Sequence, residues 1–115
     1  MIKSYKDLIV WQKGIELIRE IYNLTGNFPD EEKFSLTSQM RRSAISIPSN
    51  IAEGRARTSR KEFVQFLRIA NGSAWELETQ LIVAQKIYRD IDCSKAEKIL
   101  IEIQKMLSTM IKKLS

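Results

Sequence analysis

A run of apolar residues at alternating steps of four and three constrains the fold more than any other feature of this chain. Its members are Phe63, Leu67, Ala70, Ala74, Leu77, Leu81, Ala84, Tyr88 and Ile91. Residues at these steps share one face of an α-helix. Ser59 precedes the run and Glu62 follows it three residues later, which is the capping-box pattern that opens helices. We therefore predict a helix over residues 59–91, about 50 Å long at 1.5 Å per residue.

Three further segments have the spacing of amphipathic helices. Ser4 and Asp7 form a capping-box-like start for a helix over residues 5–25, and Ser94 with Glu97 opens another over residues 95–113. A helix over residues 36–55 lies between them. Four helices with short connections and no strand predict an all-α, antiparallel up-and-down four-helix bundle with a long third helix. The length of 115 residues predicts a single domain over residues 1–115.

The segment 47–54 combines a helical apolar pattern with residues typical of turns. Pro48 lies inside the pattern, where proline costs roughly 3 kcal/mol, so we expect the helix to be kinked or restarted there. Gly54 provides a C-terminal stop. Gly72 in the long helix is expected to allow close packing against Pro48. Phe28 and Phe34 are expected to hold the loop between the first two helices against the end of the bundle.

Several polar residues fall within segments that otherwise resemble core, and buried polar groups must be hydrogen-bonded. We expect Asn50 to be buried and bonded to the third helix near Ser73 or to a neighbouring backbone group. The full predicted structural polar cluster is Ser49, Asn50, Glu53, Asn71 and Ser73.

The composition argues against an enzyme. The chain has no histidine, and Cys93 is its one cysteine, so the commonest general base and the commonest metal ligand are missing. The carboxylates of Glu53, Glu62, Glu76 and Glu78 do not make a ferritin-like site, which needs Glu-x-x-His motifs. We expect no catalytic residues, no metal and no cofactor. With no membrane-length apolar run and no secretory segment, we expect a cytoplasmic protein without a membrane partner.

The net charge of +5 is concentrated in residues 41–68, which carry seven bases against Glu53 and Glu62. Arginine suits phosphate because its planar fork donates two hydrogen bonds at once. We therefore predict an RNA- or DNA-binding surface. Two alternatives stay open: the bases pair with acids inside an oligomer, or they bind an acidic protein partner such as a polymerase. The predicted nucleic-acid-binding residues are Arg41, Arg42, Arg55, Arg57, Arg60, Lys61 and Arg68.

Apolar residues outside the main stripes form second apolar faces on the helices, more than one bundle core needs. Large exposed apolar faces usually mark association surfaces. We therefore predict a homo-oligomer. Its predicted interface includes Leu17, Ile21, Trp75 and Ile82.

Two motifs resemble a known family. Residues 46–54 read Ser-Ile-Pro-Ser-Asn-Ile-Ala-Glu-Gly, and residues 66–81 read Phe-Leu-x-Ile-Ala-x-Gly-Ser-x-x-Glu-Leu-Glu-Thr-Gln-Leu. With Leu8-x-x-Trp11 and the Phe28-Pro29 loop, they resemble the four-helix-bundle proteins encoded by intervening sequences in bacterial large-subunit ribosomal RNA genes. The resemblance covers nearly the whole chain.

That family is itself similar to the accessory variability protein of diversity-generating retroelements. This relative is a ring-shaped homopentamer of four-helix bundles that binds nucleic acid and a reverse transcriptase. The resemblance implies a pentameric ring with a basic surface and the same kinds of partner. It supplies no catalytic residues. The leading hypothesis is a non-enzymatic oligomeric scaffold that binds RNA or DNA; the alternative is a structural or adaptor protein that binds an acidic protein.

Overall fold

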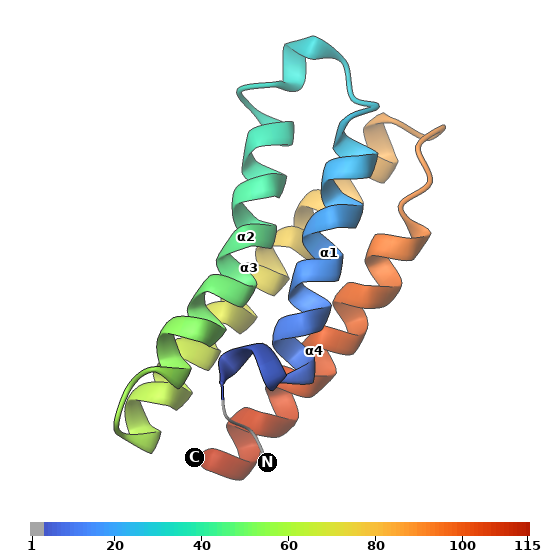
Figure 1. Cartoon of the computed structure of the whole chain (residues 1–115). Helices are drawn as coiled ribbons and strands as arrows, with labels where there is room; N and C mark the ends of the chain where they lie inside the picture. Colours follow the sequence, from blue (N-terminus) through green and yellow to red (C-terminus); the bar gives the residue numbers. More distant parts are fainter. Residues whose placement is uncertain (1–3) are drawn as a thin grey trace.

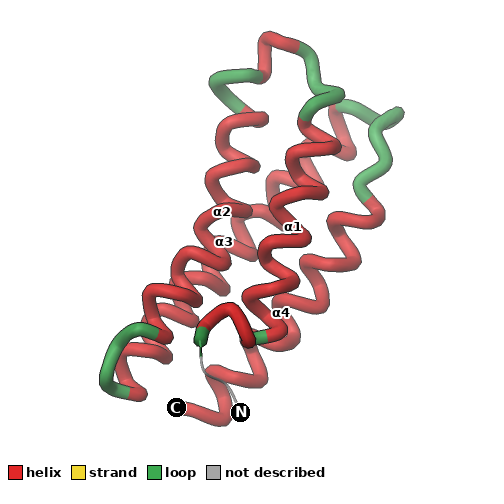
Figure 2. The backbone as a smooth tube through the Cα atoms, viewed as in Figure 1, coloured by secondary structure: helices red, strands yellow, loops and turns green. Residues whose placement is uncertain are grey.

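In the computed structural model, which describes residues 4–115, four α-helices run up and down and pack side by side (Figure 1). They are α1 (Ile9–Thr25), α2 (Leu36–Arg55), α3 (Arg60–Ile87) and α4 (Ser94–Leu114), with 3₁₀ helices η1 (Tyr5–Asp7) and η2 (Asp30–Glu32). Residues 4–115 contain no strand, and α3 is the longest helix (Figure 2). Each helix packs on two neighbours in the cyclic order α1, α2, α3, α4. The predicted all-α fold with a long third helix is confirmed.

The core contains the predicted stripe of the third helix from Leu67 to Ala84. The largest fully buried side chains come from all four helices: Leu17, Ile21, Met40, Ile47, Ile51, Leu67, Leu77, Leu81, Leu100, Ile103 and Leu107. Burial of a side chain of this size stabilises the fold by about 1.5–3 kcal/mol. None of the helices described over residues 4–115 has the length and hydropathy needed to cross a membrane.

The helix boundaries differ from the predictions where a side chain caps a different element. Ser4 and Asp7 do form a capping box, but it opens η1, and α1 begins after Leu8, which is extended. Ser59 caps α3 as predicted, since its hydroxyl accepts a hydrogen bond from the Glu62 N–H at 3.0 Å. Ser94 is not a cap: the Asp92 carboxylate accepts its N–H at 3.0 Å, and Ser94 is the first helical residue.

Helix α2 continues through Pro48, which is buried. The ring of Pro48 packs on α1 at Gly14, where an added Cβ would lie 3.1 Å from the Pro48 Cβ. The expectation that Gly72 packs closely against Pro48 is wrong, because an added Cβ at Gly72 would have no atom within 4 Å. The expected restart of the helix at Pro48 is also wrong, because α2 is one continuous helix over Leu36–Arg55.

Gly54 allows α2 and α3 to approach closely at their connected ends. An added Cβ there would lie 2.5 Å from the Cβ of Phe66. No residue of 4–115 has a positive φ, so Gly54 does not act as a left-handed cap, and α2 ends one residue later with Ala56 as its C-cap. This contact brings the end of α2 and the start of α3 together.

At the other end of the bundle, Tyr88 ends α3 and holds the α1–α2 loop. Its hydroxyl donates a hydrogen bond to the Glu32 carboxylate, and its ring lies 5.1 Å from that of Phe28. Phe28 is buried as expected, whereas Phe34 is 90% exposed, so its predicted packing role is wrong. Because Tyr88 leaves the helical conformation, α3 stops at Ile87 and is about 42 Å long.

Candidate nucleic-acid interface

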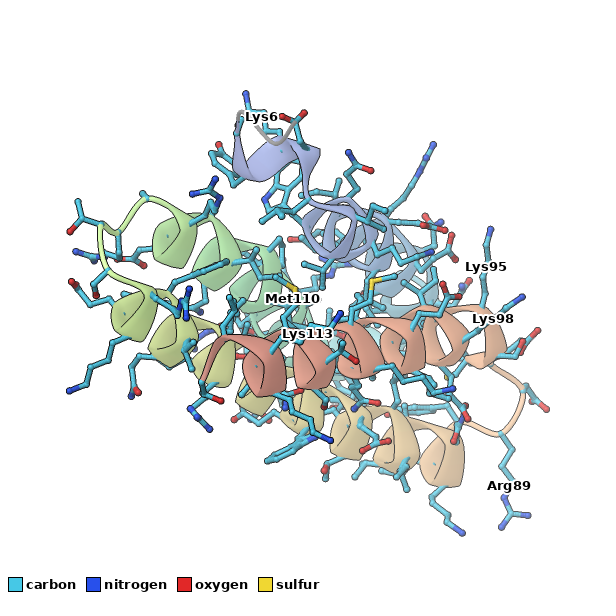
Figure 3. All side chains as sticks on the ribbon, turned by 90° about the horizontal axis from the view of Figure 1, so that it is seen from below. Lys6, Arg89, Lys95, Lys98, Met110 and Lys113 are labelled. Carbon is cyan, nitrogen blue, oxygen red and sulfur yellow. The ribbon has the colours of Figure 1, made fainter. Side chains whose placement is uncertain are left out.

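Basic side chains from three segments gather where α2 connects to α3. They come from the end of α2 and its connection, the first turns of α3, and the last turn of α4, which ends beside α3 (Figure 1). All are exposed. We call this set the basic end: Arg55, Arg57, Arg60, Lys61, Arg68, Lys112 and Lys113. Figure 3 labels Lys113 in the last turn of α4 and Lys95 in its first turn.

A groove of about 480 Å³ lies within the basic end, between α3 and the end of α4. Arg60, Lys61 and Arg68 line it, together with Val64, Gln65, Leu114 and Ser115. Within residues 4–115, none of these three bases forms an ion pair. Their N–H donors therefore face solvent and are free to bind phosphate oxygens.

Arg57 is held more firmly than its neighbours. Its guanidinium forms an ion pair with Glu53 at 3.1 Å and lies 4.9 Å from the centre of the Phe66 ring. Exposed pairs of this kind contribute little to stability. Their effect is to orient the guanidinium over the α2–α3 contact.

Arg41 and Arg42 lie outside the basic end, so the prediction of one seven-residue surface is wrong. The Arg41 Nε donates to the Thr25 hydroxyl at 3.0 Å, and its guanidinium lies 4.2 Å from the centre of the Tyr22 ring. Arg41 thereby joins the start of α2 to the end of α1. Fourteen residues of helix, about 21 Å, separate Arg41 from Arg55.

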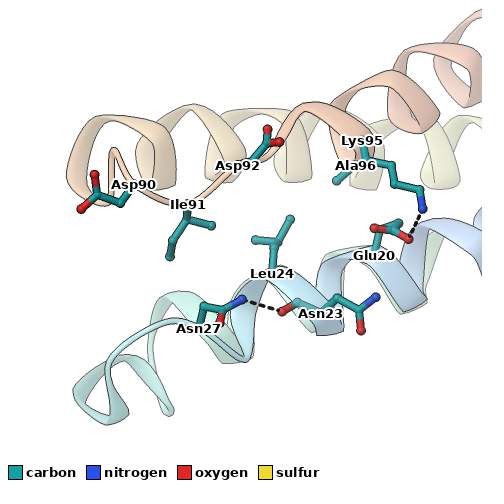
Figure 4. Close-up of a pocket in the computed structure, with 9 residues that line it drawn as sticks. All are labelled: Glu20, Asn23, Leu24, Asn27, Asp90, Ile91, Asp92, Lys95 and Ala96. Carbon is teal, nitrogen blue, oxygen red and sulfur yellow. Dashed lines mark hydrogen bonds and ion pairs between the residues drawn. The ribbon is translucent and has the colours of Figure 1, made fainter.

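The opposite end of the molecule is acidic. A groove there is lined by Glu20, Asp90 and Asp92, with Asn23, Asn27 and Lys95 (Figure 4). Lys95 pairs with Glu20 at 3.3 Å, and the Asn27 amide donates to the Asn23 carbonyl at 3.1 Å. The described part of the molecule thus has one basic and one acidic end.

Within residues 4–115, no cluster of three or more His, Cys, Asp and Glu side chains could hold a metal ion.

The Tyr88–Glu32 contact changes the acid–base properties of this acidic end. Hydrogen bonds from Tyr88, and then from Ser35, lower the pKa of Glu32. The same bond to Glu32, with desolvation, raises the pKa of Tyr88 to about 12. The pair is therefore held with Glu32 ionised and Tyr88 neutral across the neutral pH range.

The predicted polar cluster is partly formed. Ser46 and Ser73 share a hydroxyl–hydroxyl hydrogen bond at 2.7 Å, and the Asn50 amide donates to the Ser46 carbonyl at 2.8 Å and hydroxyl at 3.0 Å. Asn50 is half-buried rather than buried and reaches Ser73 through Ser46. Its bond to a neighbouring backbone group is present as predicted.

The other proposed members of the cluster do not join this network. Ser49 and Glu53 are exposed, because they lie on the solvent face of α2, and their assignment to a buried cluster is wrong. Asn71 is buried on α3, but its Oδ1 has no hydrogen-bond partner within residues 4–115. Ser46 was not among the predicted members of the cluster, although its place one turn before Asn50 on α2 is the signal that indicates it.

Of the four residues predicted to form the oligomer interface, two are buried in the core and two are exposed. Leu17 and Ile21 are fully buried in the chain's own core, because they occupy the inner face of α1, so assigning them to an interface is wrong. Trp75 and Ile82 lie on α3 and are 61% and 51% exposed. They stay available to a second copy, and further exposed apolar side chains on α3 are Ile69, Val83 and Ile87.

Comparisons with known proteins agree on one family. Residues 6–109 match the family described as 23S rRNA-intervening sequence protein. A crystal structure of a protein of unknown function from the S23 ribosomal protein family of Bacteroides thetaiotaomicron VPI-5482 is 33% identical, with a TM-score of 0.78. The match covers 90% of this chain and 96% of that one. The comparison with curated proteins gave no match. With nearly its whole length matched, this chain belongs to the 23S rRNA-intervening sequence protein family.

Proposed function

We propose that this protein is a non-enzymatic, homo-oligomeric scaffold that binds RNA or DNA through its basic end. The observation that carries the proposal is the groove lined by Arg60, Lys61 and Arg68, whose side chains have no acidic partner within residues 4–115. Phosphate contacts of this kind bind without sequence preference and respond strongly to salt. If one subunit neutralises about four phosphates, affinity for duplex DNA falls on the order of a hundredfold between 50 and 200 mM salt.

Oligomerisation would multiply these contacts. The exposed apolar side chains of α3, including Trp75 and Ile82, are suited to bury against a second copy. A closed ring would present one basic end per subunit on a common surface, and weak single contacts would then add by multivalency. The number five, and a reverse transcriptase as partner, rest on the resemblance to the accessory variability protein, which stays a prediction.

The test of nucleic-acid binding is a charge reversal that leaves the fold intact. Arg60→Glu with Lys61→Glu alters the first turn of α3, where the helix dipole stabilises acidic side chains, so the helix should be retained. Lys33→Glu with Arg89→Glu is the matched control, because both residues are exposed at the opposite end and the charge change is equal. Binding of fluorescein-labelled single-stranded RNA and duplex DNA is measured by anisotropy at 100 mM salt.

We expect the Arg60 and Lys61 variant to lose at least tenfold in affinity while the control stays within twofold of the parent. Equal binding by the folded variant and the parent would overturn the proposal. Equal losses in both variants would show that overall charge, rather than the basic end, governs binding. If the parent binds no nucleic acid but binds an acidic protein, the adaptor function replaces the proposal of nucleic-acid binding.

The test of assembly is native mass spectrometry at micromolar concentration. We expect Trp75→Glu to dissociate the oligomer, because a carboxylate would be buried without a partner. Phe34→Glu is the control, because Phe34 is also an exposed aromatic residue but lies in the α1–α2 loop. A monomeric parent would contradict the oligomer, and an unchanged Trp75→Glu oligomer would place the interface elsewhere.

A further inference from the structure

A second groove, of about 400 Å³, lies between α2 and α3 away from the basic end. Its lining residues fall on one face of each helix, at steps of three and four. They are Gln39, Arg42, Ser43 and Ser46 from α2, and Ser73, Glu76 and Gln80 from α3. Every one of these side chains is polar, although the groove separates two helices that elsewhere pack through apolar residues. Its volume suits a ligand the size of a nucleotide.

The floor of the groove is fixed by hydrogen bonds. Ser43 and Ser73 are 6% and 8% exposed, and the Ser46 and Ser73 hydroxyls are 2.7 Å apart. Asn50 donates to the Ser46 carbonyl and hydroxyl from one turn below. These bonds join α2 to α3 across the groove, so its width is set before any ligand arrives.

The upper part carries groups without partners. Arg42 on α2 and Glu76 on α3 are exposed, and neither forms an ion pair within residues 4–115. The Gln80 Oε1 is buried and accepts no hydrogen bond from any described residue. A buried acceptor without a donor is unfavourable, so this groove is suited to a ligand that brings N–H groups to α3.

The two sides of the groove require opposite hydrogen-bonding character. A carboxylate and an amide oxygen on α3 accept, whereas a guanidinium on α2 donates. Guanine matches both: its N1–H and N2 amino group donate on one edge, and its O6 and N7 accept on another, where arginine binds bidentately. Adenine presents no pair of adjacent acceptors to an arginine, and the pyrimidines are smaller.

We propose that this groove binds one guanine base, with Glu76 and Gln80 accepting from its donor edge and Arg42 donating to O6 and N7. This proposal rests on the proposed function, because the guanine would belong to a single strand that the basic end binds. Along α2, Arg42 and Arg55 are 13 residues apart, about 20 Å. A single strand stacked as in a duplex, at about 3.4 Å per nucleotide, would need about six nucleotides to reach from one to the other.

The experiment compares four fluorescein-labelled 12-nucleotide RNAs by anisotropy. One is all uridine, and the others carry two central guanosines, inosines or adenosines. Inosine lacks the N2 amino group, so it tests the donor edge alone. We expect the guanosine RNA to bind about tenfold tighter than the uridine and adenosine RNAs, with inosine in between.

Variants separate base recognition from phosphate binding. We expect Glu76→Gln and Arg42→Ala, both at exposed positions, to abolish the guanosine preference and leave uridine RNA binding within threefold of the parent. Arg60→Glu with Lys61→Glu should weaken all four RNAs by a similar factor and keep the preference. Equal affinity of the parent for all four RNAs, or a preference that survives Glu76→Gln, would overturn the inference.

A second probe decides the case in which the parent binds no RNA. Guanosine monophosphate and inosine monophosphate are titrated by calorimetry against the parent and Glu76→Gln. If the parent binds guanosine monophosphate and Glu76→Gln does not, the groove recognises guanine in a free nucleotide. That result would contradict a bound single strand as the source of the base. Absence of binding by both probes would overturn the inference, and the duplex DNA measurement described above would then decide the proposed function separately.

Discussion

Two helical glycines, Gly54 and Gly72, should respond in opposite ways to the same substitution. At Gly54 an added methyl group would lie 2.5 Å from the Phe66 Cβ and 3.1 Å from the Phe63 Cδ1. The closer atom is attached directly to the α3 backbone, so relief requires α2 and α3 to separate. At Gly72 an added methyl group would meet no atom within 4 Å.

The magnitudes follow from two terms. Alanine is favoured over glycine in a helix interior by about 1 kcal/mol, and this gain applies in full at Gly72 but at most in part at Gly54, the second-last residue of α2. Overpacking costs about 1–3 kcal/mol, with the upper value expected when backbone-attached atoms collide. Gly54→Ala should therefore destabilise the fold by about 2 kcal/mol, and Gly72→Ala should stabilise it by about 1 kcal/mol.

The assay is thermal unfolding followed by circular dichroism at one fixed protein concentration, because assembly makes the midpoint depend on concentration. For a chain of this length, 1 kcal/mol shifts the midpoint by about 4 °C. We expect Gly54→Ala to unfold about 8 °C lower, and Gly72→Ala about 4 °C higher, than the parent. A Gly54→Ala protein as stable as the parent would refute the close approach of α2 and α3.

Further predictions concern the hydrogen-bonded contacts that hold the ends and the centre of the bundle. Titration at 295 nm should show one tyrosine ionising near pH 12, and Tyr88→Phe should remove it; an unchanged curve would mean that the bond to Glu32 is absent in solution. Because the pKa of Tyr88 is raised, the stability contributed by Tyr88 should be complete below pH 10 and be lost as the pH rises toward 12. Because the pKa of Glu32 is lowered, the stability contributed by Glu32 should be complete above the ordinary glutamate pKa and be lost as the pH falls below it. In urea unfolding, Asn50→Ala should cost about 1 kcal/mol, since the Ser46 hydroxyl keeps its bond to Ser73; no change in the midpoint would show that Asn50 does not support the α2–α3 contact.

The sequence was sufficient to predict the four helices and the buried face of α3, because apolar spacing shows which residues share one face of a helix. The stripe from Phe63 to Ala84 lies on α3 as predicted, and α2 spans Leu36–Arg55. Spacing does not identify the neighbouring helix, however. Pro48 packs on Gly14 rather than near Gly72, since that choice depends on how α1 and α2 cross.

The candidate site was less accessible from sequence for the same reason. Arg41 and Arg55 lie in one charged segment, yet the length of α2 places them far apart, and Arg41 is bound to Thr25. Lys112 and Lys113 are distant in sequence but join the basic end through the antiparallel return of α4. A second apolar stripe likewise cannot show which residues remain exposed: Ile21 is buried, whereas Trp75 is not.

Photochemical cross-linking locates the surface that contacts nucleic acid, which we propose is the basic end of the bundle. The parent is irradiated with 4-thiouridine-labelled single-stranded RNA, digested, and analysed by mass spectrometry to locate the cross-linked peptides. We expect cross-links in residues 55–68 and 109–115, with none in residues 27–34 or 88–97. Cross-links confined to the acidic end, or spread evenly over the chain, would contradict the account.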